Sequence, residues 1–189
     1  EDAPLMASER FSEIRALVAV DMHTQSFFWK HPDVETVILR PAHIIGAVRN
    51  APSNYLRLAR PWSVGGFDPM VQIIHEDDAA RAIECALRPG VQGIFNIVGC
   101  QPSPLSQLLR LAGSKPVRIP HFVADGMLKR LFSMRLTSFP APELDHLRYV
   151  CMVDGRRAQE ILGFEARYDL EETMEYLRTT RIVMDGRKR

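Results

Sequence analysis

The sequence has 189 residues, 46% of them hydrophobic and 25% charged, and a formal net charge of +1. This length suits one domain with a core, or one domain with a small lobe, and the charge balance favours neither nucleic acid nor an anionic membrane as a partner. No apolar run is long enough to span a bilayer and no charged-then-apolar leader is visible, so we expect no membrane segment.

The first predicted element is a long helix from about Ser8 to Trp29. Ser8 is a suitable N-cap, and Pro32 ends the helix because proline disfavours helical conformation in the residue before it. A strand follows over 35–40, and its uninterrupted apolar run indicates a parallel strand that is covered on both faces. The helix has one predicted apolar stripe, formed by Phe11, Ile14, Leu17, Val18, Met22, Gln25 and Phe28.

Residues 42–70 form an irregular segment of the kind that often lines a pocket, with one short helix over 53–59. Strands then alternate with helices, which predicts an α/β fold with a mainly parallel sheet. We divide it into an α/β domain over 1–99 and a mainly helical substrate-binding lobe over 100–189. The further predicted elements are strands at 71–75 and 93–99, an extended segment at 116–120, and helices at 77–87, 105–112, 121–134, 154–162 and 170–181.

Three widely spaced cysteines, Cys85, Cys100 and Cys151, form neither a disulfide framework nor a metal-ligand pattern, and they indicate a reducing, cytoplasmic setting. The sequence contains no G-x-G-x-x-G turn, so if the fold binds a dinucleotide, the part that would hold the pyrophosphate is missing. Open α/β sheets bind ligands outside the carboxyl ends of their strands. We therefore expect the residues that follow Pro41 to lie beside a ligand.

Four short runs, met in one order, carry a resemblance to a known family. They are Leu39-Arg40-Pro41 with Gly46 and Asn50, the run Ile-His-Glu-Asp-Asp-Ala-Ala-Arg-Ala-Ile at 74–83, the run Gly-Ile-Phe-Asn-Ile-Val-Gly at 93–99, and Asp154-Gly155-Arg156-Arg157-Ala158 with Leu162-Gly163-Phe164. Their order resembles the C-terminal part of the extended short-chain dehydrogenases/reductases, the NAD-dependent epimerase/dehydratase family. The resemblance implies the C-terminal portion of a Rossmann-like parallel sheet with a small helical substrate lobe, and NAD or NADP as cofactor.

The resemblance also implies roles for two residues of the long predicted helix and for two residues that follow the strand at 35–40. The family's catalytic Tyr-x-x-x-Lys pair falls on Phe11 and Arg15, so no hydroxyl is present there to exchange a proton with the substrate. Arg15 keeps a cation that could hold the cofactor's ribose, and Pro41 and His43 are implied as further cofactor contacts. The alternatives are a core aromatic at Phe11, a surface cation at Arg15, and a hydrogen-bonded loop histidine at His43.

On the substrate side the resemblance implies Asn50, Gln72 and Arg156. A planar guanidinium suits a diphosphate, although Arg156 is equally well explained as a surface residue that pairs with a nearby carboxylate. The family's sugar-nucleotide enzymes often carry an Arg four residues before the His of the second run, and this chain has Val71 there. Both a sugar nucleotide and a hydrophobic ketone are therefore kept as substrate classes.

Two further groups of residues each have two interpretations. His75, Asp77 and Asp78 have the side chains of a metal site, but the sequence implies no further ligand at a suitable spacing. The resemblance implies instead that an acidic residue caps the helix here. An apolar, Met-rich group forms either the core of the helical lobe or a wall for a hydrophobic substrate. Its members are His121, Phe122, Met127, Leu131, Phe132, Met134 and Phe139.

Three functions remain open on these observations. The first is the substrate-binding C-terminal part of an NAD(P)-dependent epimerase/dehydratase-like protein, catalytically impaired at Phe11 and Arg15. The second is a non-catalytic module that binds a cofactor or a partner, and the third is an NAD(P)-dependent oxidoreductase or isomerase of a hydrophobic alcohol or ketone. We expect a small-molecule substrate and no metal, and the family's two-helix contact implies a homodimer through the long N-terminal helix.

Overall fold

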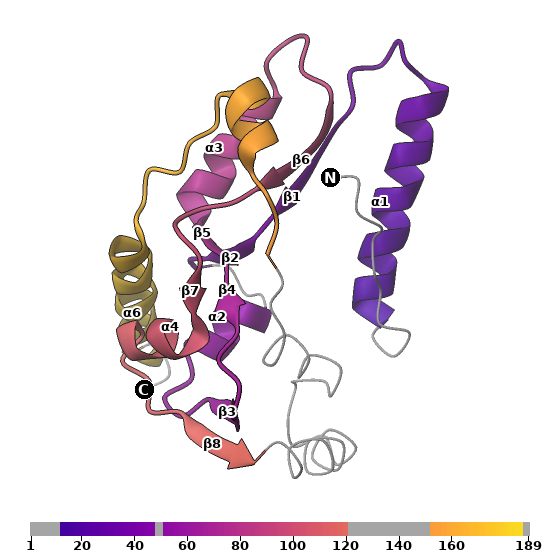
Figure 1. Cartoon of the computed structure of the whole chain (residues 1–189). Coiled ribbons are helices and arrows are strands. Elements are labelled where there is room, and N and C mark those ends of the chain that lie inside the picture. Colours follow the sequence, from indigo (N-terminus) through magenta and orange to yellow (C-terminus); the bar gives the residue numbers. More distant parts are fainter. Residues whose placement is uncertain (1–11, 48–50, 121–151, 187–189) are drawn as a thin grey trace.

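The computed structural model describes residues 12–47, 51–120 and 152–186 (Figure 1). The helices are α1 Ser12–Lys30, α2 Ala51–Leu56, α3 Glu76–Ala86, α4 Leu105–Leu111, the π-helical turn η2 Ala158–Leu162, and α6 Leu170–Gly186. The strands are β1 Val37–Pro41, β2 His43–Ile45, β3 Trp62–Gly65, β4 Met70–Val71, β5 Ile73–His75, β6 Gly93–Ile97, β7 Ser103–Pro104 and β8 Val117–Pro120. The predictions for Ser8, Phe11, Asn50, Cys151, the helix at 121–134 and the Met-rich group fall outside the described residues.

Most strand pairs are parallel, as the alternation of strands and helices predicts. β1 pairs with β6 from Val37↔Gly93 to Pro41↔Ile97, β2 pairs with β5, and β3 pairs with β8, whereas β4 and β7 form the one antiparallel pair among the strands of the described residues. The chain passes from the first pair to the second at Ala42, whose N–H donates to the carbonyl of Ile97 at 2.8 Å. The predicted α/β class with a parallel sheet is confirmed.

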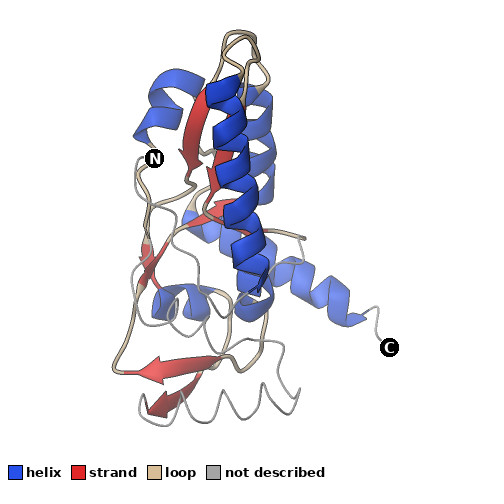
Figure 2. Cartoon of the chain, turned by 90° about the vertical axis from the view of Figure 1, so that its right-hand side faces the viewer, coloured by secondary structure: helices blue, strands red, loops and turns tan. Residues whose placement is uncertain are grey.

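Two helices cover opposite faces of the β1–β6 pair. Figure 1 shows the pair between α1 and α3, and Figure 2, viewed from the side of α1, shows α1 in front of the strands. The alternation of side chains explains this arrangement. Val37 and Leu39 pack with α3, whereas Arg40 contacts α1 on the other face. β1 is therefore covered on both sides, as its apolar run predicts.

The buried apolar residues of the described ranges form two clusters. One joins β2, β5, α2, β3, α4 and α6 around Ile45, Ile73, Leu108 and Met174. The other joins β6, α3, η2 and the end of β5 around Phe95, Ile74 and Leu162. Each cluster contains residues from both sides of position 99, so the packing does not follow the division into 1–99 and 100–189, which stays a prediction. The predicted irregular segment at 42–70 holds β2, α2 and β3.

The predicted apolar stripe of α1 is wrong in part. Leu17 and Met22 are 70% and 61% exposed, whereas Asp21 is half-buried and faces β1. Arg40 of β1 donates from Nε and Nη2 to the two carboxylate oxygens of Asp21, at 2.8 and 2.9 Å. This charged, two-bond contact turns the polar Asp21 toward the strand, and apolar periodicity alone could not show that.

The Asp21–Arg40 pair makes a pH-dependent contribution to stability. Hydrogen bonding to Arg40 lowers the pKa of Asp21, although partial burial opposes the shift. Because the folded-state pKa is depressed, the contribution is present above the unfolded pKa and is lost as pH falls through the folded value. We expect Asp21→Asn to lower the free energy of unfolding by about 1 kcal/mol at pH 7, and the difference to vanish in acid. Urea unfolding of both chains between pH 7 and pH 3 checks this, and a difference independent of pH would contradict it.

Candidate functional site

The carboxyl ends of β1 and β6 lie at the same end of their sheet as the N-terminal end of α1 (Figure 1). The contact between Asp21 and Arg40 fixes the position of α1, along its own axis, relative to β1. Arg15 lies six residues before Asp21, which corresponds to about 9 Å along a helix axis. Its exposed side chain therefore starts beyond the end of β1, on the ligand side of an open α/β sheet.

Two of the predicted cofactor contacts lie at this end of the sheet. Pro41 is the exposed last residue of β1, and its missing N–H ends the donor pattern of the strand. His43 is half-buried at the start of β2, opposite Ile73 of β5. The fold thus brings Pro41 and His43 to the same end of the sheet as Arg15, while their roles as cofactor contacts stay predictions.

The predicted substrate residue Gln72 is engaged within the chain. It is buried, its Nε2 donates to the carbonyl of Val153 at 2.9 Å, and its Oε1 accepts from the N–H of Val153 at 2.7 Å. Asn96 of β6 donates to the carbonyl of the next residue, Asp154, at 3.2 Å. Two side-chain amides therefore hold the segment at 153–154 against the strands, and a substrate contact from Gln72 stays a prediction.

Arg156, the other described substrate residue, forms an exposed ion pair. Its Nε donates to Asp154 Oδ2 at 2.7 Å, and the two side chains are 80% and 55% exposed. Hydrogen bonding between the two groups lowers the pKa of Asp154 and raises that of Arg156. This is the surface-pair alternative weighed from the sequence, and a pair so open to water adds little to stability.

His75 caps α3, so the expectation that an acidic residue would do so is wrong. Its Nδ1 accepts from the N–H of Asp77 at 3.1 Å. Glu76, Asp77 and Asp78 occupy the first turn, where their negative charges interact favourably with the helix dipole. His75 itself is 2% exposed. The described residues contain no cluster of three or more side chains suited to a metal.

Two tyrosines that sequence reasoning missed enclose His75. The Tyr168 ring stacks on the imidazole at 3.9 Å between centroids, and the Tyr176 ring lies at 4.7 Å. Tyr168 donates to Asp77 at 3.1 Å and Tyr176 donates to Glu76 at 2.7 Å, and these hydrogen bonds raise the pKa of both phenols. Both hydroxyls therefore stay protonated at neutral pH, and the group joins the C-terminal segment to the start of α3.

Asp78 is the fully buried carboxylate of the same region. Its oxygens accept from the backbone N–H groups of Arg167 and Tyr168 at 3.0–3.1 Å, and from Arg81 Nη1 at 2.7 Å. The charge is thus paired and hydrogen-bonded, which is the condition for burying it. Asp78 anchors the chain just before α6 onto α3.

Cys100 lies near the same strands but is unsuited to act as a nucleophile. Burial raises the pKa of its thiol to about 11. Only the thiolate is strongly nucleophilic, and it is scarce at neutral pH when the pKa is so high. Covalent catalysis by Cys100 is therefore disfavoured.

Comparisons with known proteins place these features in context. No family model matches the chain. An uncharacterized protein of Mycobacterium tuberculosis and one of Mycobacterium bovis are each 31% identical over 147 residues, which cover 77% of this chain and 39% of theirs. Among helices in the described ranges, none is long and apolar enough to cross a membrane.

Solved structures with the same fold include a dehydratase and two epimerases. dTDP-glucose 4,6-dehydratase from Bacillus anthracis in complex with NAD has a TM-score of 0.66 at 14% identity, over 98% of this chain and 56% of that chain. UDP-glucose-4-epimerase from Stenotrophomonas maltophila with bound NAD has 0.64 at 16%, over 92% and 55%. UDP-N-acetylglucosamine 4-epimerase from Bacillus cereus has 0.61 at 16%, over 89% and 56%.

The parallel strands with helices on both faces define a Rossmann-like α/β protein. Its fold is that of the NAD-dependent epimerases and dehydratases, as the sequence motifs predict. The chain spans about half the length of these solved structures, between 55% and 56%, and 39% of the curated relatives.

Proposed function

We propose that this chain is the C-terminal, substrate-binding part of an NAD(P)-dependent epimerase/dehydratase-like protein. The observation that carries the proposal is that Pro41 and His43 lie at the carboxyl end of β1, at the same end of the sheet as the first turn of α1, which contains Arg15. This is the end of an open α/β sheet at which ligands bind. Two neighbours of the same fold are described as being in complex with NAD or as having bound NAD, and one from Pseudomonas aeruginosa as complexed with NADPH.

The residues at this carboxyl end of the sheet fit the ribose and nicotinamide side of a dinucleotide. The exposed guanidinium of Arg15 offers a fixed cation with several N–H donors to hydroxyl groups. The sequence offers no glycine-rich turn for the pyrophosphate. When bound, NAD or NADP would supply a hydride acceptor or donor, while Arg15, Pro41 and His43 would position it. Phe at position 11 carries no proton for the substrate, so we propose that proton transfer at this position is impaired.

A hydrophobic ketone or alcohol is our proposed substrate class. Val71 packs against the apolar cluster of β2, α4 and α6 where the family's sugar-nucleotide enzymes often place an Arg. Gln72 is engaged by Val153, and Arg156 by Asp154. These contacts leave fewer groups to hold a diphosphate. UDP-glucose, which a neighbour from Thermotoga maritima is described as holding, is the comparison ligand for this proposal.

The cofactor proposal is tested by titrating NADH and NADPH into the natural polypeptide that contains this chain, followed by fluorescence. We expect Arg15→Ala to weaken binding about tenfold, because a charge-assisted hydrogen bond is lost. The matched control is Lys30→Ala, an exposed cation at the opposite end of α1, which should bind as the parent does. Failure of the natural polypeptide to bind either dinucleotide at about 1 mM would overturn the proposal.

A non-catalytic cofactor- or partner-binding module is the second candidate, and Phe11 with Arg15 in place of Tyr and Lys favours it. NAD-dependent turnover by the natural polypeptide would exclude this candidate.

We also propose that two copies pair through α1. Its exposed apolar side chains support a contact surface. They are Leu17, Val20, Met22, Phe27 and Trp29.

A further inference from the structure

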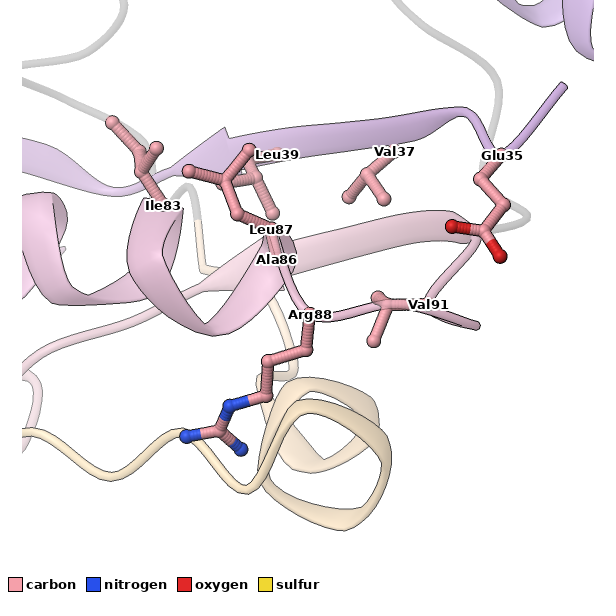
Figure 3. Close-up of a pocket in the computed structure, with 8 residues that line it drawn as sticks. All are labelled: Glu35, Val37, Leu39, Ile83, Ala86, Leu87, Arg88 and Val91. Atoms are coloured by element: carbon pink, nitrogen blue, oxygen red, sulfur yellow. The ribbon is translucent and has the colours of Figure 1, made fainter.

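The two ends of α3 have different surroundings. The C-terminal half borders an apolar groove of about 350 Å³, lined by Leu39 from β1 and by Ile83 and Leu87 on the side of α3 (Figure 3). The N-terminal end packs instead against tyrosine rings and carries three carboxylates. The buried group at this end that can change its charge near neutral pH is His75, because histidine alone among side chains ordinarily titrates between pH 5 and 8.

The cap of α3 requires that Nδ1 of His75 carries no proton. This nitrogen accepts from the N–H of Asp77 at 3.1 Å, and an imidazole nitrogen that bears a proton is a donor without a free lone pair. In the neutral ring the hydrogen therefore lies on Nε2, so a second proton can bind only at Nδ1. The capped helix and a protonated His75 thus exclude each other.

Charged and titratable groups surround His75 from four parts of the chain. On α3, Asp77 Oδ2 lies 3.7 Å from Nδ1, and this side chain is 63% exposed, so it connects the buried ring to solvent. The neighbouring strand β2 contributes the apolar Ile45 opposite His75. Asp77 is therefore the nearest acceptor for a proton on Nδ1. The other groups are Glu76 and Asp78 of α3, Arg81 paired with Asp78, Tyr168 before α6, Tyr176 of α6, and Arg57 after α2, whose charge acts on Glu76 and Tyr176.

The tyrosine rings couple the orientation of His75 to the C-terminal segment. Tyr168 is stacked on the imidazole with 16° between the ring planes, and the Tyr176 ring is tilted by 56°. A protonated Nδ1 would point its N–H at the N–H of Asp77, and two donors repel. Asp78 holds the first turn of α3 through buried hydrogen bonds, so the imidazole rather than the helix has to turn. Such a turn breaks the parallel contact with Tyr168.

We propose that His75 is a pH-sensitive switch between α3 and the C-terminal segment. As a neutral ring it caps α3 and stacks on Tyr168. A proton from solvent that binds the lone pair of Nδ1 ends the hydrogen bond from Asp77 N–H, and the new N–H donates to the Asp77 carboxylate while the ring leaves Tyr168. Asp78 keeps its bonds to the backbone before α6, so the release is confined to the cap and the aromatic contact. The switch is independent of the proposed function.

Acid should favour the released state, because that state binds one proton more than the capped state. A histidine without such contacts titrates at about pH 6.5, so the released state should gain about tenfold on the capped state between pH 7.5 and pH 5.5. Carboxylates ordinarily titrate at about pH 4. The hydrogen bonds of Asp78 should therefore persist over this range.

The switch is tested by NMR on the natural polypeptide that contains this chain, labelled with ¹⁵N. Between pH 7.5 and pH 5.5 we expect Nδ1 of His75 to take up a proton. With the same midpoint, the Asp77 amide should lose about tenfold in protection from hydrogen exchange, after correction for the intrinsic effect of pH. The Arg167 amide, which bonds to Asp78, should keep its protection. Protonation of His75 without a change at Asp77, no pH response at Asp77, or an equal loss at Arg167 would each overturn the proposal.

His75→Asn tests the same point without a titratable ring. Asn is a good N-cap whose side-chain oxygen accepts at any pH, so the protection of Asp77 should become independent of pH over this range. His31→Asn is the matched control, since His31 is an exposed histidine that contacts Phe27 after α1, and this variant should respond as the parent does.

A pH response of Asp77 that survives in His75→Asn would overturn the switch. Should that variant fail to fold, the titration of the parent decides. Coincident midpoints for the His75 ring and the Asp77 amide support the switch, and separate midpoints overturn it.

Discussion

Gly99→Ala should lower the free energy of unfolding by about 2–4 kcal/mol, the largest effect we expect from a single added methyl group. A Cβ at position 99 would lie 2.4 Å from the carbonyl oxygen of Ile73 and 2.6 Å from the Cα of Ile74. Both are backbone atoms of β5, which cannot rotate away as a flexible side chain can. The residues just after β6 would have to move from β5, and the core around Ile74 would open.

The matched control for Gly99 is Gly65→Ala, in β3. There the nearest atom to an added Cβ is the carbonyl oxygen of Ile119 at 3.4 Å, an ordinary contact. We expect that variant to stay within about 0.5 kcal/mol of the parent. Urea unfolding followed by circular dichroism, with the slope of the transition unchanged, measures both. Equal stability of the two variants would show that the approach of the chain at Gly99 to β5 is not as close as described.

Asp78→Asn should lower the free energy of unfolding by about 3 kcal/mol. The carboxylate is fully buried and accepts hydrogen bonds from Arg81 and from the N–H groups of Arg167 and Tyr168. An amide in its place loses the charge that pairs with Arg81 and turns a donor toward groups that are themselves donors. The C-terminal segment should therefore loosen from α3.

Asp77→Asn is the control for this variant, because the neighbouring side chain is 63% exposed. Its loss of charge should change the stability by about 0.5 kcal/mol or less. Hydrogen exchange adds a local readout: in Asp78→Asn the amides of Arg167 and Tyr168 should lose their protection, and in Asp77→Asn they should keep it. Unchanged protection at both amides in Asp78→Asn would contradict the anchoring role.

Local patterns in the sequence predicted the strands and helices whose ends are marked by residues within or next to the element itself. The apolar run before Pro41 is β1, the run at 93–97 is β6, and Gly163 ends η2 with a left-handed φ of 62°. Such signals lie within a few residues, so no knowledge of distant partners is needed. The motif around Pro41 also marks the carboxyl end of β1, of which Pro41 is the last residue, while a binding site at that end stays a prediction.

Partners distant in sequence could not be predicted in this way. Tyr168 and Tyr176 reach His75 only because α6 folds back onto α3, and no spacing in the sequence links them. Gln72 has the residue type of a substrate contact, yet both atoms of its amide are bonded to the backbone of Val153. Residue type shows what a side chain can bind, whereas the fold determines which neighbour it meets.

The sequence by itself determined the α/β class, the place of β1 and the order of the motifs, because hydrophobic runs, prolines and glycines act on the backbone around them. Only the tertiary structure decided that α1 faces β1 through Asp21, that His75 caps α3, and that Tyr168 and Tyr176 reach His75. Each of these depends on contacts between elements whose approach is set by the packing of the whole core.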